Sequence, residues 1–364
     1  SNRFQSLNRG CMRFLKKSLI GNFEPTIKEL QMKKSFKFLW IGLIGLAPYF
    51  LSAQIITVNG PIEPKEMGLA LIHEHIMVDW IGADSTGYHR WDRDEIVEIA
   101  LPYLAELEKH GVTSFLDCTP AYLGRDPYVL KKLSELTGIH ILTNTGYYGA
   151  GNNKYIPERL MNASPEQMAE QWIAEFRYGI DGSGIRPGFI KMAVDDRDVL
   201  SQTHENLIRA AALTHLETGM TIVSHTGRDG PAMAQLKVLK EMGVSPKAFV
   251  WTHAQNGTLD GYLRAAGQGA WISLDHINGL PSDGNANLGN IVWFIKMLLE
   301  LKANGVLDHV LISHDAGWYN VGEKNGGDYR GYTDLFTKLI PRLKENGFTQ
   351  YDIDLILKDN PSRA

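Results

Sequence analysis

Residues 69–76 read LALIHEHI, and this stretch determines how the rest of the chain is interpreted. An apolar run, LALI, leads directly into His73 and His75. In a β-strand, residues two apart face the same side, so both imidazoles can point inward while Glu74 points out. The stretch therefore predicts a strand whose end offers two histidine ligands to one metal ion.

Four later segments repeat this pattern of an apolar run that ends in a side chain able to bind metal. They are GFIKMAV (188–194) with Lys191, TIVSHTG (221–227) with His225, FVWTHAQN (249–256) with His253, and HVLISHDAG (309–317) with Asp315. The ligands follow one another at 191 − 75 = 116, 225 − 191 = 34, 253 − 225 = 28 and 315 − 253 = 62 residues. Eight strand–helix units of a barrel take roughly 250 residues. The spacing therefore favours strands one, four, five, six and eight.

The whole chain alternates apolar, β-branched runs with helical patterns. Nearly continuous hydrophobicity in eight such runs indicates parallel strands covered on both faces. The predicted helices include residues 94–110, 165–180, 204–219 and 291–304. We expect an α/β fold, a (β/α)8 TIM barrel, preceded by a short N-terminal β hairpin over residues 55–68. An open doubly wound sheet is the alternative, although no GxGxxG motif opens the first helix.

Three loops rich in Gly and Asn follow predicted strands three, seven and eight. They span residues 149–157, 278–290 and 319–331. Barrel enzymes carry their chemistry at the carboxyl ends of the strands, where these loops begin. We expect the loops to cover the pocket and select the substrate.

Composition limits the classes of partner. The chain has 364 residues and a net charge of −4, without a basic block, which argues against nucleic acid and favours a small-molecule substrate. Cys11 and Cys118 are the two cysteines, so there is no disulfide framework. We interpret Cys118 as a small buried hydrophobic residue.

The N-terminal region resembles an export signal. Met32-Lys33-Lys34 provides a basic start, residues 38–51 are apolar, and Ser52-Ala53-Gln54 offers a cleavage point. The predicted organisation is an upstream leader over 1–31 that is absent from the mature protein, a signal peptide over 32–53, and one hydrolase barrel over 54–364. We expect a periplasmic or secreted protein that contacts the membrane only during export. An uncleaved anchor is the alternative.

At its candidate ligands the chain resembles the phosphotriesterase-like family of the amidohydrolase superfamily, over about residues 55–360. The matching features are the HxH of strand one, the Lys of strand four, the single His residues ending strands five and six, and the Asp of strand eight. TVNG (57–60), LDHI (274–277) and NPSR (360–363) are also similar. The resemblance implies a binuclear metal-dependent hydrolase that cleaves lactones, carboxylic esters or phosphoesters with a hydroxide bridging the metals.

The resemblance also implies a ligand set for two divalent ions, zinc being the first choice. His73, His75 and Asp315 would hold the more buried ion, His225 and His253 the more exposed one, and Lys191 would bridge them. An unmodified ammonium repels cations and has no lone pair. The bridging role therefore implies that Lys191 is carboxylated by carbon dioxide to N6-carboxylysine.

Catalytic and substrate-binding roles follow from the same resemblance. Asp315 would accept the proton released in the reaction, and His276 would relay it outward. The family keeps a carboxylate three residues after the strand-six histidine, where this chain has Asn256, which puts the complete relay in question. Tyr148 matches a tyrosine that contacts the substrate in lactonases, yet those lactonases often have Arg at the position of His276. The substrate therefore stays open among the three ester classes.

Other interpretations remain. The chain could be a mononuclear deaminase-like amidohydrolase, although that class needs an acid soon after His253, or a non-catalytic barrel with a structural metal. Lys191 could instead pair with Asp195 or Asp196 at the end of its strand. The sequence also leaves open whether the protein forms a homodimer.

Overall fold

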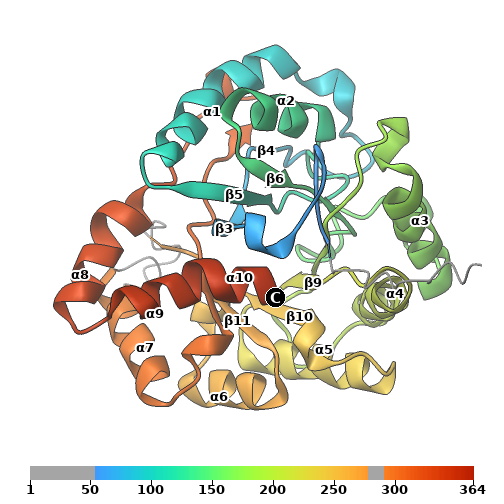
Figure 1. Ribbon diagram of the computed structural model, residues 1–364. Coiled ribbons are helices and arrows are strands. Elements are labelled where there is room, and N and C mark those ends of the chain that lie inside the picture. The colour runs from blue at the N-terminus through green and yellow to red at the C-terminus, as the bar shows by residue number, and fades with distance from the viewer. Residues whose placement is uncertain (1–53, 278–290) are drawn as a thin grey trace, which may run out of the picture. The chain divides into compact units, whose positions relative to one another are not determined.

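The computed structural model describes residues 54–277 and 291–364 (Figure 1). The predicted leader, the predicted signal peptide and the predicted loop over 278–290 lie outside the described residues. Within the described ranges, no helix has both the length and the apolar character needed to cross a membrane.

A small hairpin precedes the barrel, as the sequence predicts. Strand β1 (Ile55–Thr57) pairs antiparallel with β2 (Gly60–Ile62), with Ile55 opposite Ile62. Gly60 has a φ of 116°, a backbone conformation that side chains strongly disfavour, which explains a glycine at this turn.

Parallel strands form the barrel wall. Their order in the chain is β3 (Leu69–Glu74), β5 (Val112–Asp117), β6 (His140–Leu142), β7 (Asn144–Thr145), β8 (Phe189–Ala193), β9 (Ile222–His225), β10 (Phe249–Thr252), β11 (Trp271–Leu274) and β12 (Val310–Ile312). One set pairs in the order β3-β5-β6, and the other in the order β7-β8-β9-β10-β11-β12. Because only Thr143 separates β6 from β7, these two segments form one interrupted third strand that joins the two sets.

The barrel closes where its last strand meets its first. Backbone hydrogen bonds run from Asp315 N to His73 O at 3.0 Å and from His75 N to Ala316 O at 2.9 Å. Eight strand positions are therefore joined in a ring, and the predicted (β/α)8 TIM barrel with its N-terminal hairpin is confirmed.

Helices surround the strands (Figure 1). They are α1 (Arg93–Glu108), α2 (Pro127–Thr137), α3 (Pro165–Tyr178), α4 (Gln202–Thr218), α5 (Asp229–Glu241), α6 (Leu259–Gln268), α7 (Ile291–Ala303), α8 (Ile340–Glu345), α9 (Gln350–Asp354) and α10 (Asn360–Arg363). Side-chain caps fix several starts: Ser164 and Gln167 form a capping box at α3, and Ser201 caps α4. Gly219, in the left-handed conformation, ends α4.

Two more strands connect the loops above the barrel. Strand β4 (Met77–Val78) follows β3 and pairs parallel with β13 (Tyr319–Asn320), which follows β12. The loops after the first and last barrel strands are thereby held together. They begin at the same end of the barrel as the candidate ligands.

Candidate metal centre

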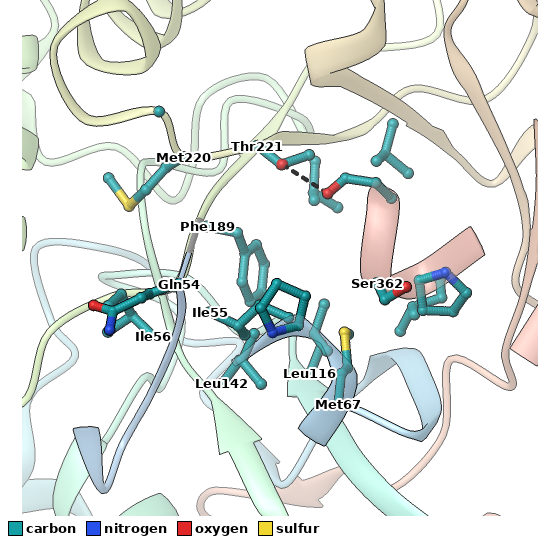
Figure 2. Close-up of a pocket in the computed structure, with 18 of the residues that line it drawn as sticks. Gln54, Ile55, Ile56, Met67, Leu116, Leu142, Phe189, Met220, Thr221 and Ser362 are labelled. Carbon is teal, nitrogen blue, oxygen red and sulfur yellow. Dashed lines mark hydrogen bonds between the residues drawn. The ribbon is translucent and has the colours of Figure 1, made fainter. Parts of the chain in front are cut away.

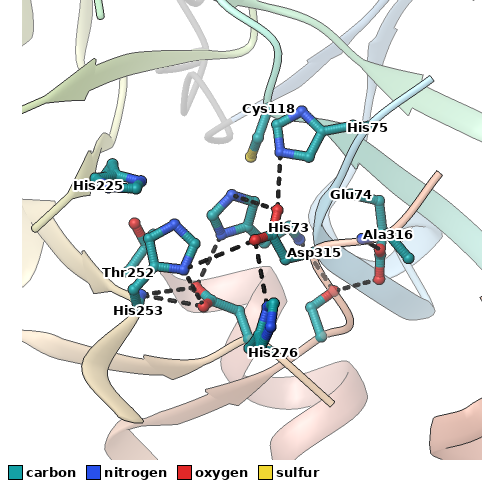
Figure 3. Close-up of polar contacts among 12 residues, drawn as sticks. His73, Glu74, His75, Cys118, His225, Thr252, His253, His276, Asp315 and Ala316 are labelled. Atoms are coloured by element: carbon teal, nitrogen blue, oxygen red, sulfur yellow. Dashed lines mark hydrogen bonds and ion pairs between the residues drawn. The ribbon is translucent and has the colours of Figure 1, made fainter. Parts of the chain in front are cut away.

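All six predicted ligands lie at or near the carboxyl ends of barrel strands and meet in one cluster. Figure 3 shows five of them, namely His73, His75, His225, His253 and Asp315. Lys191 and His225 lie within their strands, whereas His253 and Asp315 lie just beyond theirs. His253 and Asp315 have φ values of 56° and 54°, so the chain turns at these positions and directs both side chains inward.

His73, His75 and Asp315 form a compact group. Asp315 Oδ1 lies 3.1 Å from His75 Nε2 and 3.9 Å from His73 Nε2. The three donor atoms lie close enough together to hold one metal ion. These are the residues that the family resemblance assigns to the more buried ion, and both histidines are buried.

His225 and His253 lie beside this group. Their ring centroids are 4.2 Å apart, and the His253 ring is 4.9 Å from that of His73. The His225 residue is partly exposed, unlike the fully enclosed His73. The pair therefore lies on the more open side of the cluster.

Lys191 is buried at the centre of the site. Its Nζ lies 3.1 Å from His73 Nε2. Neither alternative partner holds it: Asp195 accepts hydrogen bonds from backbone N–H groups, including that of Gly151, and Asp196 forms an ion pair with Arg228. The structure thus directs Lys191 toward the cluster rather than to an acidic neighbour.

Hydrogen bonds and close polar contacts also fix the orientation of the His73, His75 and His253 rings. The Thr119 hydroxyl donates to Met77 O, so it accepts Nδ1–H from His75 at 2.8 Å. Asp275 likewise accepts Nδ1–H from His73 at 2.8 Å and from His253 at 2.9 Å. In the His73 and His75 rings this leaves the Nε2 lone pair facing the Asp315 carboxylate. Metal-ligating histidines in proteins are oriented in this way. The His253 ring instead approaches that carboxylate with Nδ1, which lies 4.0 Å from Oδ2.

Asp275 is a site residue that the sequence analysis missed. Its carboxylate has no exposure and also accepts from the backbone N–H of His253, the hydroxyl of Ser273 and the amide of Gln255. Because its oxygens already accept these hydrogen bonds, we assign Asp275 to positioning the histidines rather than to binding an ion. It directly follows the apolar run WISL, the same signal that identified the ligands.

Glu74 faces away from the cluster, as strand alternation predicts, and joins the first strand to the last. Its Oε1 accepts from the Ser313 hydroxyl and from Nδ1 of His314, both buried, while Oε2 accepts from Ala316 N. These bonds hold the segment on either side of Asp315. His314 therefore has a structural role.

Electrostatics keep the cluster in a form that suits cations. Burial lowers the pKa of His75 to about 4, and burial also holds the pKa of His225 well below its usual value. Burial and then the Lys191 charge lower the pKa of His73. Burial opposes charge on His253, but the Asp275 carboxylate raises its pKa overall. Three of the four imidazoles therefore favour the neutral form that binds metal.

Asp315 provides the test of whether these residues fit a metal. Burial would raise the pKa of Asp315, but His276 and His75 beside it hold that pKa well below its usual value, so the carboxylate is charged. Its Oδ1 is buried and makes no hydrogen bond of acceptable geometry. A charged oxygen that lacks a donor, facing lone pairs of neutral imidazoles, fits a bound cation.

The two predicted substrate contacts lie at the edge of the cluster. Tyr148 OH is 3.1 Å from Nδ1 of His225. His276 Nδ1 is 3.6 Å from Asp315 Oδ2, too long for a hydrogen bond but close enough for electrostatic attraction. Asn256, where a carboxylate was expected, is exposed and lies in the short turn after His253.

Comparison with known proteins identifies the family of the chain. A model of the phosphotriesterase family matches residues 53–364. The chain is 29% identical to the phosphotriesterase homology protein of Escherichia coli, over 81% of this chain and 97% of that protein. It is also 29% identical to an aryldialkylphosphatase of Saccharolobus solfataricus, over 83% of this chain and 96% of that enzyme. An N-acetyltaurine hydrolase of Salmo salar is 26% identical, over 86% and 98%.

The chain therefore belongs to the phosphotriesterase family. Members of this family bind two divalent metals, and the His and Asp groups at the strand ends provide donors for such ions. The protein is a metal-dependent hydrolase.

Proposed function

We propose that this hydrolase cleaves ester-type bonds, namely lactones, carboxylic esters or phosphoesters, at a centre of two divalent metal ions. The observation that carries the proposal is the inward orientation of the His73 and His75 Nε2 atoms toward the unsatisfied Oδ1 of Asp315. Supporting names among the relatives are the aryldialkylphosphatase and the phosphotriesterase homology proteins.

We further propose that the metals are zinc and that Lys191 is carboxylated. The Lys191 ammonium would first lose a proton, and the neutral amine would then form an N–C bond to carbon dioxide and lose a second proton, so that a cation becomes a carbamate anion. Burial and the absence of a carboxylate ion pair for Lys191 among the described residues favour that change. When bound, the ions supply Lewis-acid polarisation of the scissile bond and a water molecule of lowered pKa.

The protein's own residues then handle the proton and the substrate. Asp315 is charged and lies 3.6 Å from His276, so it can accept a proton and pass it toward this partly exposed imidazole. Tyr148 lies against His225 at the cluster's edge, where its hydroxyl can contact a substrate. Asp275, Thr119 and Glu74 keep the ligands in position.

Amide hydrolysis is a second candidate because several relatives are N-acetyltaurine hydrolases. The same cluster can act on an amide, whose carbonyl carbon is less reactive. The chain's overall identity to these relatives, 24–26%, is lower than the 29% shared with the aryldialkylphosphatase. We therefore place esters first.

One experiment tests the proposal. Metal content and hydrolysis of lactone, aryl ester, phosphotriester and N-acyl amide panels are measured for the wild type, Lys191→Ala and the exposed control Lys237→Ala. We expect close to two metals per chain in the wild type and the control, turnover of at least one ester class, and loss of both in Lys191→Ala.

Three results would contradict the proposal. One metal per chain with unchanged hydrolysis in Lys191→Ala would remove the bridging role and favour a mononuclear, deaminase-like enzyme. Two metals without turnover of any panel member would favour a binding barrel. Turnover of amides alone would replace the ester assignment.

We also propose that the protein is exported and that residues 32–53 are a cleaved signal peptide. The basic start at Met32 and the apolar run over 38–51 support this proposal. Fractionation of expressing cells and N-terminal sequencing of the mature protein test it. A cytoplasmic product, or one that retains residues 32–53, would contradict it.

A further inference from the structure

A cavity lies inside the barrel, and Figure 2 shows residues that line it. Its volume is about 560 Å³. Phe189 and Val223 line it, and each precedes a predicted ligand, Lys191 or His225, by two residues on the same parallel strand. Side chains two apart face the same interior, so the cavity lies toward the amino ends of the strands, beneath the cluster.

The wall of this cavity is apolar. It includes Leu116, Leu142, Phe189, Val223, Val250 and Leu311, all buried inside the barrel. Barrel interiors are normally filled by such side chains. The volume instead falls within the roughly 300–1,000 Å³ typical of ligand pockets. Polar side chains occur among the lining residues contributed by the loops and helices that border these strands.

Arg186 is a cationic lining side chain without a hydrogen-bond or ion-pair partner among the described residues. Its guanidinium lies 5.7 Å from the Phe176 ring but forms no ion pair with any carboxylate of the described residues, the Ala364 terminus included. By contrast, Arg363 donates to the side chain of Asn360 and to backbone oxygens, and the Thr221 hydroxyl donates to Ala364 O. No Asp or Glu from the described ranges lines the cavity.

We propose that this cavity binds an anionic amphiphile of the fatty-acid class. The hydrocarbon chain would occupy the space bounded by Leu142, Phe189 and Val250, and the carboxylate would pair with Arg186. Each buried methylene contributes roughly 0.8 kcal/mol, which gives an apolar chain a reason to enter. A partly buried guanidinium without a counterion selects a carboxylate over a neutral or cationic head group.

This site is separate from the proposed hydrolysis, because none of its lining residues belongs to the metal cluster. Binding can therefore be measured on metal-free protein and on Lys191→Ala. A failure to hydrolyse esters would leave the binding result unaffected. A failure to bind the amphiphile would likewise leave the proposed ester hydrolysis unaffected.

The test uses isothermal titration calorimetry of the metal-free full chain with decanoate, decanol and decyltrimethylammonium. Leu142→Trp fills the cavity, and Arg186→Gln removes the charge. Arg177→Gln is the control, since this guanidinium lies on α3 and does not line the cavity. We expect one saturable decanoate site per chain and at least tenfold weaker binding in Leu142→Trp. Arg186→Gln should weaken decanoate roughly tenfold, about 1.4 kcal/mol, and leave decanol unchanged.

Several outcomes would overturn the proposal. If the wild type shows no saturable decanoate binding, the cavity is a gap in the packing and not a ligand site. Unchanged binding in a folded Leu142→Trp would place the ligand elsewhere. Equal loss of decanoate and decanol in Arg186→Gln, or preferred binding of decyltrimethylammonium, would exclude the anionic class. If Leu142→Trp does not fold, the ratio of decanoate to decanol affinity in Arg186→Gln still decides.

Discussion

The indole ring of Trp318 is stacked on the imidazole of His75, with 3.8 Å between the ring centroids. Trp318 Nε1 also donates to Asp315 O at 2.9 Å. A single side chain therefore contacts two proposed ligands of the same ion. Trp318 has a φ of 76°, which is rare for a bulky residue, and the surrounding contacts must hold it there.

Trp318→Leu is expected to weaken metal binding, because His75 loses the ring that limits its rotation. Substitution of residues that orient metal ligands typically costs about 10–100-fold in affinity, and we expect the lower end. Competition with a chromophoric chelator measures this. Trp318→Phe keeps an aromatic ring and should retain most of the affinity. Equal affinity in Trp318→Leu and wild type would show that the stacking has no positioning role.

Asp275→Asn is expected to lower metal affinity more strongly, by about 100-fold, since one carboxylate orients both His73 and His253. The substitution keeps the size of the side chain but removes its charge and one acceptor. Metal content after dialysis against graded chelator provides the measurement. Asp260→Asn, in an exposed pair with Arg264, is the control and should match the wild type. Unchanged metal content in Asp275→Asn would contradict the positioning role.

Glu175→Gln is expected to reduce the free energy of unfolding by about 3 kcal/mol, because Arg125 would remain charged and buried. Arg125 donates to both carboxylate oxygens of Glu175, at 2.8 and 2.9 Å. Chemical denaturation measures the change. Glu217→Gln breaks a half-exposed pair with Arg177 and should cost less than about 1 kcal/mol. Similar losses of unfolding free energy in Glu175→Gln and Glu217→Gln would show that the buried ion pair is no more important for stability than the exposed one.

Cys118 should resist alkylation in the folded protein. Burial raises the pKa of its thiol from 9.0 to about 12, so the reactive thiolate is scarce near pH 8. A pKa raised by folding means that this contribution to stability is present below pH 9 and is lost as the pH rises from 9 toward 12. Mass spectrometry of iodoacetamide-treated protein measures the modification of Cys118, with urea-unfolded protein as the control. Rapid native alkylation would mean that the thiol is accessible.

Much of the barrel could be predicted from sequence because strand periodicity is local. The alternation in LALIHEHI separates Glu74 from His73 and His75, and the structure places them on opposite faces. The regular spacing of ligands along the chain likewise reflects the strand–helix repeat. Helix limits were within two residues for α3, α4 and α7, where caps or apolar patterns define the ends.

The supporting residues could not be predicted because their roles depend on tertiary contacts. Thr119 is 44 residues from His75, and nothing in the sequence pairs its hydroxyl with that ring. The interruption of strand three at Thr143 also lacks a local signal, since IHILTNTG reads as one run. Asp275 also follows an apolar run, as the predicted ligands do. Its neighbour His276 matched the family motif, however, and was given the role in the site instead.

The closing of the barrel between β3 and β12 has a consequence for how the protein matures. The first and last barrel strands supply His73, His75 and Asp315 to a single proposed ion, so the ion would link β3 to the segment that follows β12. This link can form only after the chain has been synthesised beyond Asp315, at position 315 of 364. A chain truncated ahead of Asp315 would therefore lose one proposed ligand of the ion together with the backbone hydrogen bonds that close the barrel.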